Sequence, residues 1–486
     1  MKDTRLVAGL DIGTSNIKLS IFNLFGESVF DANVAYPTYY PYEGYAEQSP
    51  KDWILAITNQ FAQLKQKMGS MAQQVAALGL SAHAPTLILI DKFGNSLLDR
   101  TPIWCDERST QEAAWLNERV GAAFSGLGLP GASFPAKLLW FQRNHPEITR
   151  QAAYSVGIKS FLCNWLCGSL YTDPSSEPGN QESWRKVMEA CEWPLDQLPL
   201  IAKPTQVVGH LRPELCISAG LPLGLPVVIG INDGGSSTLS CGAYRPGDAV
   251  IELATNGVIY LVTDHRIDAN TCLNRSLFCW NYIDDLWILG GQTKCGAIAY
   301  QWAAELLGEK KEIELSKWLQ IAESAPRGSR GLFFFPFLKG QGTPEENPNV
   351  RAAFIGLNIK TSKADLYRSV VEGVSFSISE ILVFLRQYNQ KIERLFITGG
   401  GAQNHFPRQV TAEILGKPLA WTNSQTTLGA AILAAVGVGI FKDAQEAVKS
   451  MVPSPLKILP DQAGVSEYFP IFNTYRKFKT QISALY

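Results

Sequence analysis

The sequence predicts an α/β protein of two domains with a cleft between them. A chain of 486 residues is too long for one ordinary hydrophobic core, and two domains of about 200 to 250 residues are expected. A strand–turn–strand unit with small polar residues at its tip also occurs twice, about 240 residues apart. Alternating helix and strand patterns follow each unit, which indicates two α/β domains related by duplication. We expect domains over 1–245 and 246–486, with a hinge at 243–248.

The two strand–turn–strand units are read directly from their apolar runs. In the first, over residues 6–22, two apolar strands are joined by a Gly/Thr/Ser turn at 13–15. The second has a strand at 249–253, a turn at 254–257 and a strand at 258–262. Each unit places its polar groups at the tip, so both tips are candidates for ligand binding.

The remaining periodicity predicts the other elements of both halves. Helices are predicted over 52–68, 109–121, 135–143, 294–307, 363–386 and 404–415. Short buried strands over 227–231 and 394–397 each run into a glycine-rich turn. The apolar run 429–441 is shorter than the roughly 18 residues of a membrane span and predicts a buried helix. The last helix, about 463–486, is expected to pack back on the first domain.

Charge and cysteine usage narrow the class of protein. Lys plus Arg (43) nearly equals Asp plus Glu (44), so neither a nucleic acid nor an anionic membrane is an expected partner. The nine cysteines lack metal-ligand spacing and are expected to be buried thiols in a reducing cytosol. The charged residues 1–6 run straight into a strand and leave no room for a signal peptide. We therefore expect a cytoplasmic protein.

The tips of the two hairpins carry groups suited to phosphate. At the first tip, Thr14 and Ser15 offer hydroxyl and backbone N–H groups, and Asp11 ends the strand where Mg²⁺ with its waters would lie. The second tip offers Thr255 from the other domain, so the two hairpins would clamp a triphosphate from both sides. Phosphoryl transfer needs such positioning and charge compensation. An ordinary β-hairpin is the alternative for either tip taken alone.

A run of three glycines at 399–401 separates a strand from the helix that starts near Asn404. Bare backbone without Cβ atoms allows a flat ring to lie against it, and adenine is the natural occupant. A simple turn is the alternative for this motif.

Asp233 follows the buried strand 227–231 and precedes a helix of small residues. Ligands of α/β sheets bind at the carboxyl ends of strands, and a carboxylate there can accept the proton of an attacking hydroxyl. The alternative is that Asp233 caps the helix through its side chain.

These segments, in this order, resemble the FGGY carbohydrate kinases, relatives of glycerol kinase, gluconokinase and xylulokinase. The resemblance covers essentially the whole chain and is most specific over 352–357 and 365–372, which match the family's C-terminal signature. Further matching segments are 46–50, Trp104 with Asp106 and Arg108, 137–142, 335–338 and 347–351. The resemblance implies the duplicated ribonuclease H-like architecture of actin and hexokinase. It also implies ATP and Mg²⁺ as cofactors and an alcohol group of a sugar as phosphoryl acceptor, with a homodimer as one compatible assembly.

The resemblance also assigns roles to individual residues. Asp11 is implied to be the magnesium-side acid and Asp233 the catalytic base. The resemblance and the turn chemistry together place the nucleotide against Thr14, Ser15, Thr255, Gly296, Gly400 and Asn404. Ala254 stands where the family often has the glycine that begins the second phosphate loop, and we expect activity to survive this change.

The sugar side departs more from the family. Xylulokinases and gluconokinases commonly carry Met-His in the strand-end loop that touches the sugar, and this chain has Ala84-Pro85 there. The residues expected to face the substrate are His83, Trp104, Asn232 and Asp233. A loop histidine without a ligand and a core tryptophan are the alternatives for His83 and Trp104.

The substrate stays open among three classes. A ketopentose such as xylulose or ribulose is favoured slightly over gluconate or another sugar acid, and over glycerol or another alditol. A sugar acid would need a cationic partner, for which Arg108 and Lys137 are candidates. A non-catalytic, actin-like ATP-binding protein is the reading of a different class, and Asp233 argues against it because a binding module needs no acid facing the phosphates.

Overall fold

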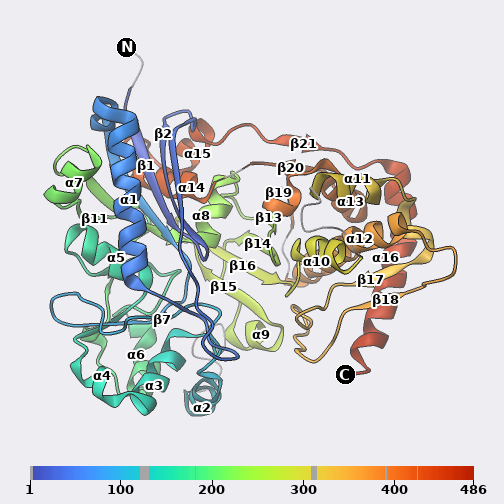
Figure 1. The fold of residues 1–486 in the computed structure, drawn as a ribbon, viewed down its shortest axis with the longest axis horizontal. Coiled ribbons are helices and arrows are strands. Elements are labelled where there is room, and N and C mark those ends of the chain that lie inside the picture. The colour runs from blue at the N-terminus through green and yellow to red at the C-terminus, as the bar shows by residue number, and fades with distance from the viewer. Residues whose placement is uncertain (1–3, 121–130, 181, 308–314, 389–390, 424) are drawn as a thin grey trace.

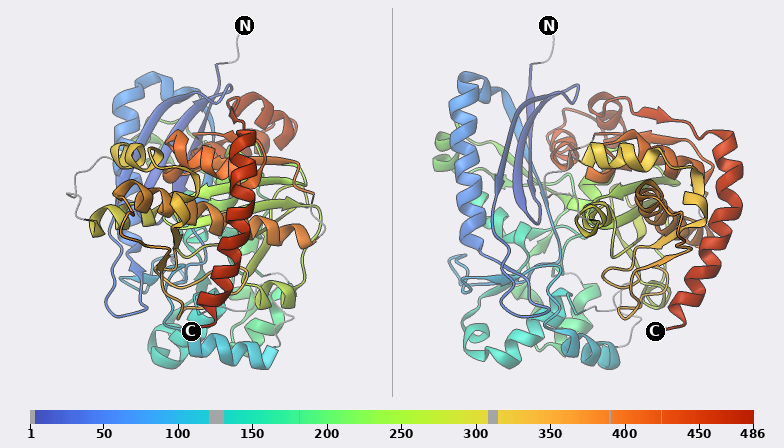
Figure 2. Two further views of the ribbon diagram at one scale, coloured as in Figure 1. Left: turned by 90° about the vertical axis from the view of Figure 1, so that its right-hand side faces the viewer. Right: turned by 45° about the vertical axis from the view of Figure 1, so that its right-hand side comes forward.

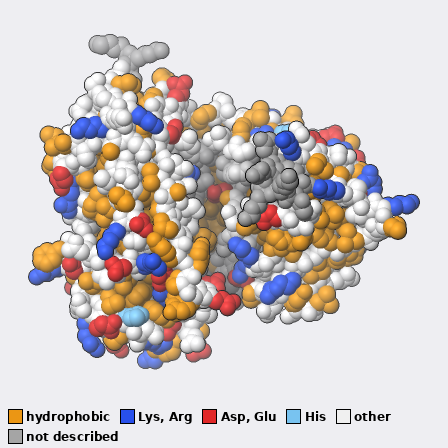
Figure 3. Space-filling model, in the orientation of Figure 1, with side chains coloured by type: hydrophobic (Ala, Val, Ile, Leu, Met, Phe, Trp, Pro, Cys, Tyr) orange, Lys and Arg blue, Asp and Glu red, His pale blue; other side chains and the backbone are white. Residues whose placement is uncertain are grey.

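Two mixed β-sheets, each flanked by helices, form two lobes with a recess between them (Figures 1 and 3). The structure is a computed structural model that describes residues 4–120, 131–180, 182–307, 315–388, 391–423 and 425–486. Part of the charged N-terminal segment at 1–6 and the last residue of the helix predicted over 109–121 therefore lie outside the described residues. The predicted two-lobed α/β architecture is confirmed.

The first sheet has six strands in the order β11-β12-β5-β1-β2-β3. Its strands are β1 (Leu6–Ile12), β2 (Asn16–Asn23), β3 (Ser28–Ala35), β5 (Val75–Ala82), β11 (Val207–His210) and β12 (Pro226–Asn232). β1, β2 and β3 form an antiparallel meander, whereas β5 and β12 run parallel to β1 and β11 closes the edge antiparallel to β12. Every residue of β1 is buried, which explains its continuous apolar run.

The second sheet repeats this arrangement with one additional strand. Its strands are β13 (Asp248–Leu253), β14 (Gly257–Thr263), β15 (Leu277–Asn281), β16 (Trp287–Gln292), β19 (Arg394–Thr398), β20 (Leu419–Trp421) and β21 (Leu456–Ile458). β13 and β14 form the antiparallel hairpin, β19 and β20 continue parallel to β13, and β21 closes the edge antiparallel. The shared topology agrees with the expected duplication, and the boundary at 245 remains a prediction.

The helices and short strands complete the two lobes. The helices are α1 (Pro50–Met68), α2 (Thr110–Val120), α3 (Phe134–Asn144), α4 (Pro146–Gln151), α5 (Ile158–Cys167), α6 (Arg185–Ala190), α7 (Pro213–Ala219), α8 (Asp233–Ser240), α9 (Ala269–Asn274), α10 (Ile298–Leu306), α11 (Leu315–Glu323), α12 (Lys363–Leu385), α13 (His405–Leu415), α14 (Thr426–Gly437), α15 (Ala444–Met451) and α16 (Gln462–Ser483). The two-stranded pairs are β4 (Glu47–Gln48) with β7 (Thr101–Pro102), β6 (Ile88–Ile90) with β8 (Tyr154–Val156), β9 (Tyr171–Thr172) with β10 (Leu200–Ile201), and β17 (Phe333–Phe335) with β18 (Ala353–Ile355). In the described part of the chain, every helix is too short or too polar to span a bilayer.

A hydrophobic core under the recess joins the lobes. α8 follows β12, α14 follows the equivalent strand β20, and the two helices pack against each other. Their backbones approach so closely that a Cβ on Gly429 would lie 2.1 Å from the carbonyl oxygen of Ser236, so only glycine fits there. The surrounding core takes Val7 from the first sheet and Val250 from the second. The helix predicted over 429–441 is α14, and it is buried as expected.

The expected hinge segment at 243–248 is tied to the second sheet. The backbone N–H groups of Tyr244 and Arg245 each donate to Asp248 Oδ2 at 2.9 Å. Arg394 Nε on β19 donates to the other oxygen of the same carboxylate at 2.6 Å. These hydrogen bonds fix segment 243–248 to the second lobe.

The last helix differs from its expected packing. α16 lies against α13 and the short 3₁₀ turn Arg327–Gly331, on the outer side of the second lobe (Figure 2). Tyr468 and Tyr475, one heptad apart, are fully buried in the core of that lobe. The segment that returns to the first lobe is instead α14 with α15, because α14 covers β1 and β5 and the hydroxyl of Ser450 on α15 donates to the Leu24 carbonyl at 2.8 Å. The amphipathic pattern of α16 predicts that the helix packs on one face, but it does not identify the lobe against which it packs.

Candidate active site

The carboxyl ends of β1, β5 and β12 bring two predicted acids to one edge of the first sheet. Asp11 lies beside Ser81 in register, and Asn232 lies beside Ala82. The Ser81 hydroxyl donates to Asp11 Oδ1 at 2.8 Å. Asp233 begins α8 immediately after β12. The sheet topology thus places Asp11 and Asp233 at the same end of two parallel strands on either side of β5, as predicted for ligand binding.

The helix cap of α8 is Asn232, which leaves Asp233 available. Asn232 Oδ1 accepts from the Gly235 N–H at 2.7 Å, whereas Asp233 Oδ1 accepts from the adjacent Gly234 N–H, at 2.8 Å. The proposed alternative role of Asp233 as the cap is therefore taken by its neighbour. Burial, together with the negative charges of Asp11 and Glu252, raises the pKa of Asp233 to about 7.

Glu252 on β13 is a third acid at this place, and the sequence reading missed it. The Ser237 hydroxyl donates to Glu252 Oε2 at 3.5 Å, which ties this acid of the second lobe to α8. Burial raises the pKa of Glu252, a hydrogen bond with Tyr260 lowers it, and the charge of Asp11 raises it. The available signal was a glutamate in an otherwise apolar strand, which is costly to bury without a function or a partner.

Asp11 lies deep in the site. Its side chain is nearly inaccessible, and burial raises its pKa to about 6 against the opposing effects of the Ser81 hydrogen bond and the charge of Lys18. Across the described ranges of the chain, no group of three Asp, Glu, His or Cys side chains could enclose a metal ion alone. A metal ion here would therefore need ligands beyond the protein, such as water and phosphate.

The tip of the first hairpin is held in place by side chains from β4 and from the segment after β7. Trp104 Nε1 donates to the Thr14 hydroxyl at 2.9 Å, and Gln48 Nε2 donates to the Thr14 carbonyl at 2.6 Å. Ser15 is exposed at the tip. Trp104 is only partly buried, so it is not simply a core residue, and its indole fixes a hydroxyl predicted to contact phosphate.

The second tip and the predicted nucleotide residues share one edge of the second sheet. The Gly296 N–H donates to the Thr255 carbonyl at 2.8 Å, and a Cβ on Gly296 would lie 2.3 Å from Asn256 C. The helix predicted from residue 294 begins only at Ile298 because this segment first bonds to the 254–257 turn. The side chain of Thr255 is exposed beside it.

The glycine turn lies against the same edge. A Cβ on Gly401 would lie 2.5 Å from Ala297 Cβ, whereas a Cβ on Gly400 would meet no atom within 4 Å. Gly400 thus presents open backbone, as a site for a flat ring requires. Asn404 caps α13 by accepting from the Phe406 N–H at 2.9 Å. The structure therefore brings Thr255, Gly296 and Gly400 together. Asn404 lies nearby and serves as the N-cap of α13.

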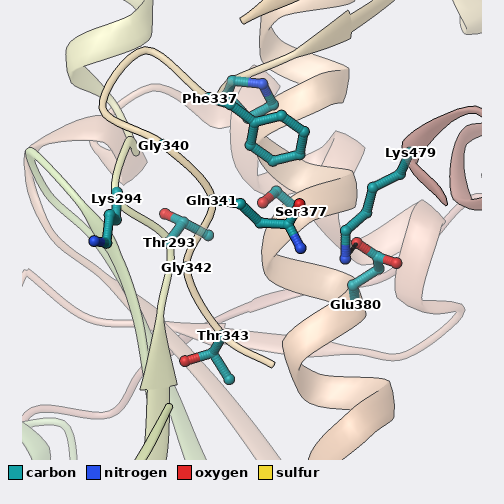
Figure 4. Close-up of a pocket in the computed structure, with 11 residues that line it drawn as sticks. Thr293, Lys294, Phe337, Gly340, Gln341, Gly342, Thr343, Ser377, Glu380 and Lys479 are labelled. Atoms are coloured by element: carbon teal, nitrogen blue, oxygen red, sulfur yellow. Dashed lines mark ion pairs between the residues drawn. The ribbon is translucent and has the colours of Figure 1, made fainter. Parts of the chain in front are cut away.

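The small cavity shown in Figure 4 lies beside this edge but is not the ligand site. It has a volume of about 10 Å³, which holds one water at most. It is lined by Thr293, Gln341 and the ion pair of Lys479 with Glu380, whose Nζ–Oε2 distance is 2.9 Å. Thr293 Oγ1 accepts from the Gly257 N–H at 2.9 Å, so this wall supports the second hairpin.

His83 follows β5 and has an unused nitrogen. Its backbone N–H donates to the Ile12 carbonyl at 3.0 Å, and its Nδ1 lies 3.3 Å from the Thr86 hydroxyl. Its Nε2 is buried and has no hydrogen-bond partner among the residues that the structure describes. Burial, with the charge of Lys137, lowers the pKa of His83 to about 3, so the imidazole is neutral. A neutral ring with a free nitrogen suits a hydroxyl ligand.

Asn232, also predicted on the sugar side, is engaged by the scaffold at both side-chain atoms. Its Oδ1 caps α8, and its Nδ2 donates to the Ser175 carbonyl at 3.0 Å.

The two cations near the sugar-side loop are engaged as well. Arg108 donates to Asp106 at 2.7 and 2.8 Å and to Glu47 at 2.6 Å. Lys137 Nζ donates to the carbonyls of Ile103 at 2.6 Å and Pro85 at 3.2 Å. Burial lowers the pKa of Lys137 to about 7.

Comparison with known proteins decides the family. The N-terminal domain model of the FGGY family of carbohydrate kinases matches residues 6–240, and the C-terminal domain model matches residues 265–438. The chain belongs to the FGGY family of carbohydrate kinases. This FGGY kinase is accordingly a phosphotransferase that uses ATP as phosphate donor and a sugar as acceptor. The family match argues against the alternative of a non-catalytic, actin-like ATP-binding protein.

Similar proteins cover the full length of this FGGY kinase. It is 28% identical to the xylulose kinase of Escherichia coli (strain K12), over 98% of this chain and 99% of the relative. It is 27% identical to the gluconokinase of Bacillus subtilis (strain 168), over 99% of this chain and 98% of the relative. A ligand-bound xylulose kinase structure from Lactobacillus acidophilus has a TM-score of 0.89 at 26% identity, covering 99% of each chain. The gluconate kinase structure from the same organism has a TM-score of 0.87 at 25% identity, covering 99% of this chain and 98% of the other.

Asp11→Ala should raise the Mg²⁺ concentration for half-maximal rate by about 10- to 100-fold, because it removes an acid aimed at the metal and its waters. The KM for sugar should change much less. A magnesium titration of steady-state ADP release measures both. Asp99→Ala, which removes an exposed acid, is the control and should behave as wild type. An unchanged titration for Asp11→Ala would remove Asp11 from the metal side of the site.

Proposed function

We propose that this FGGY kinase transfers the γ-phosphoryl group of ATP, with Mg²⁺, to a hydroxyl of a small neutral sugar, a ketopentose of the xylulose or ribulose type. The observation that carries the choice of a neutral sugar is the engagement of Arg108 and Lys137 by protein groups. The relatives support a sugar kinase, and their names include both xylulose kinase and gluconokinase.

A sugar acid would need a cation that is free to pair with its carboxylate. The Arg108 side chain is 4% exposed and already compensates Asp106 and Glu47, so its withdrawal would leave two acids unpaired. Lys137 is fully buried and donates to the carbonyls of Ile103 and Pro85. Burial lowers its pKa to about 7. Neutral hydroxyls need only hydrogen-bonding groups, and the free Nε2 of His83 supplies one.

The residues of the site divide the work of phosphoryl transfer. Asp233 accepts the proton of the attacking hydroxyl, while Thr14 and Thr255 approach the phosphates from the two lobes. Asp11 and the negative field of Asp233 and Glu252 fit Mg²⁺, a hard cation that keeps several waters and binds through phosphate oxygens. When bound with ATP, the ion supplies neutralisation of phosphate charge. Gly400 leaves room for the nucleoside, and Gly296 lets its segment pack against the turn that carries Thr255.

A substrate panel tests the proposed substrate class. Among xylulose, ribulose, gluconate and glycerol, we expect the highest kcat/KM with a ketopentose, measured by coupled ADP release. His83→Ala should raise the KM for the preferred sugar, by about tenfold for one lost hydrogen bond, without a comparable change for ATP. His210→Ala, which removes an exposed histidine of β11, is the matched control. Gluconate as the best substrate would contradict the neutral-sugar assignment.

Asp233→Asn should lower kcat by about 10² to 10⁴ while ATP binding stays nearly intact, because the amide cannot accept the hydroxyl proton. Steady-state rates and equilibrium titration with an unreactive ATP analogue measure the two effects.

The pH profile tests the same role in the unmodified enzyme. With the pKa of Asp233 raised to about 7, protonation removes the acceptor as the pH falls through this value. Each further unit of acid should then cost kcat/KM about tenfold. Near wild-type turnover of Asp233→Asn, or a profile that stays flat down to about pH 5.5, would place the base elsewhere.

A further inference from the structure

A fully buried ion pair lies behind the catalytic edge of the first lobe and has no part in the site described so far. Lys159 on α5 pairs with Asp173, which follows β9, and their side chains are 1% and 0% exposed. Burying such a pair removes two charges from water, and the gain in stability is often small or negative. Its position next to an active site therefore calls for a role other than stability.

Asp173 organises the loop that follows it. Its Oδ1 accepts from the Ser175 N–H at 2.9 Å and from the Ser175 hydroxyl. Its Oδ2 accepts from the Ser176 hydroxyl at 2.6 Å and pairs with Lys159. Both carboxylate oxygens are thus used to hold one short segment in a single conformation.

Ser175 in turn holds the residue before the base. Its hydroxyl oxygen accepts from the Asn232 N–H at 3.0 Å, and its carbonyl accepts from Asn232 Nδ2, also at 3.0 Å. Asn232 caps α8 through Gly235 and precedes Asp233 directly. A continuous chain of polar contacts therefore runs from Lys159 through Asp173, Ser175 and Asn232 to the base.

Lys159 also acts on Asp233 through its charge. The groups that face Asp233 are Asp11 on β1, Glu252 on β13, Tyr260 on β14, Tyr36 after β3 and Lys159 on α5. Asp11 and Glu252 raise the pKa of Asp233, and Lys159 lowers it. The lysine thus opposes the two acids that disfavour the charged form of the base.

We infer that Lys159 and Asp173 are positioning residues for phosphoryl transfer, which fix Asp233 through Ser175 and Asn232 and offset the negative charges around it. The inference rests on the proposed role of Asp233 as the base. The positive charge of Lys159 favours the ionised form of the Asp233 carboxylate. The loop held by Asp173 fixes the orientation of Asp233 at the start of α8.

Two variants test this inference. Lys159→Met removes the charge at similar length, and the double variant Lys159→Met with Asp173→Asn removes both charges, which leaves no unpaired buried ion and protects folding. Both should lower kcat by about 10- to 100-fold, because small displacements of a reacting group are costly. Both should also move the acid limb of kcat/KM to higher pH, while the KM for ATP stays within about twofold of wild type because the chain of contacts from Lys159 to Asp233 includes none of the residues proposed to bind the nucleotide.

Three further variants separate positioning from simple structural damage. Lys159→Arg keeps the charge and should keep the acid limb at its wild-type position. Ser175→Ala cuts the same chain of contacts by removing one hydroxyl and should lower kcat even if the charge variants fold poorly. Lys479→Met on α16, which breaks the largely buried pair with Glu380 on α12, should lower thermal stability without moving the limb.

A folded double variant with wild-type kcat and an unmoved acid limb would overturn the inference, provided that Asp233→Asn, measured alongside, is inactive. If Asp233→Asn keeps turnover, the proposed base is wrong and this inference falls with it. The two failures are therefore distinguished in one set of assays.

Discussion

Three carboxylates, Asp11, Asp233 and Glu252, are held at one buried edge where two sheets meet. Burial raises the pKa of all three, the charge of Asp11 further raises that of Glu252, and the charges of Asp11 and Glu252 further raise that of Asp233. We propose that Mg²⁺ bound with ATP offsets these negative charges. Burial and the charges of Asp11 and Glu252 raise the pKa of Asp233 to about 7, a range that suits the general base proposed for it.

The duplicated topology is what brings the acids together. Each lobe contributes a hairpin, two parallel strands and a helix, and the close approach of α8 and α14 fixes the distance between the two sheets. Asp11 and Asp233 come from parallel strand ends of the first sheet, and Glu252 comes from the equivalent of β1 in the second. A mutation that changes the α8–α14 contact at Ser236 and Gly429 would therefore also affect Asp233, which begins α8 one turn away.

Local sequence patterns were sufficient to predict both hairpins and the position of Asp233 at a strand end. Glycine-rich turns after apolar runs located both hairpins, and the strand end before small residues located Asp233. Two neighbouring side chains, Asn232 and Asp233, could each have capped α8, and only the folded geometry shows that the amide takes that task. Glu252 was missed because one acid in an apolar strand has no local pattern that marks its partners. The prediction that α16 packs on the first lobe was wrong, because an amphipathic pattern indicates that a helix packs but does not identify its partner.

The proposed transfer depends on one carboxylate, Asp233, and one sugar hydroxyl, and a crystal structure with a ketopentose, Mg²⁺ and an unreactive ATP analogue tests this pairing directly. The predicted result has a sugar hydroxyl within about 2.6–3.2 Å of an Asp233 oxygen, with the terminal phosphate between the tips that carry Thr14 and Thr255. A sugar bound with every hydroxyl out of reach of Asp233, or a nucleotide bound away from Thr255 and Gly400, would contradict it.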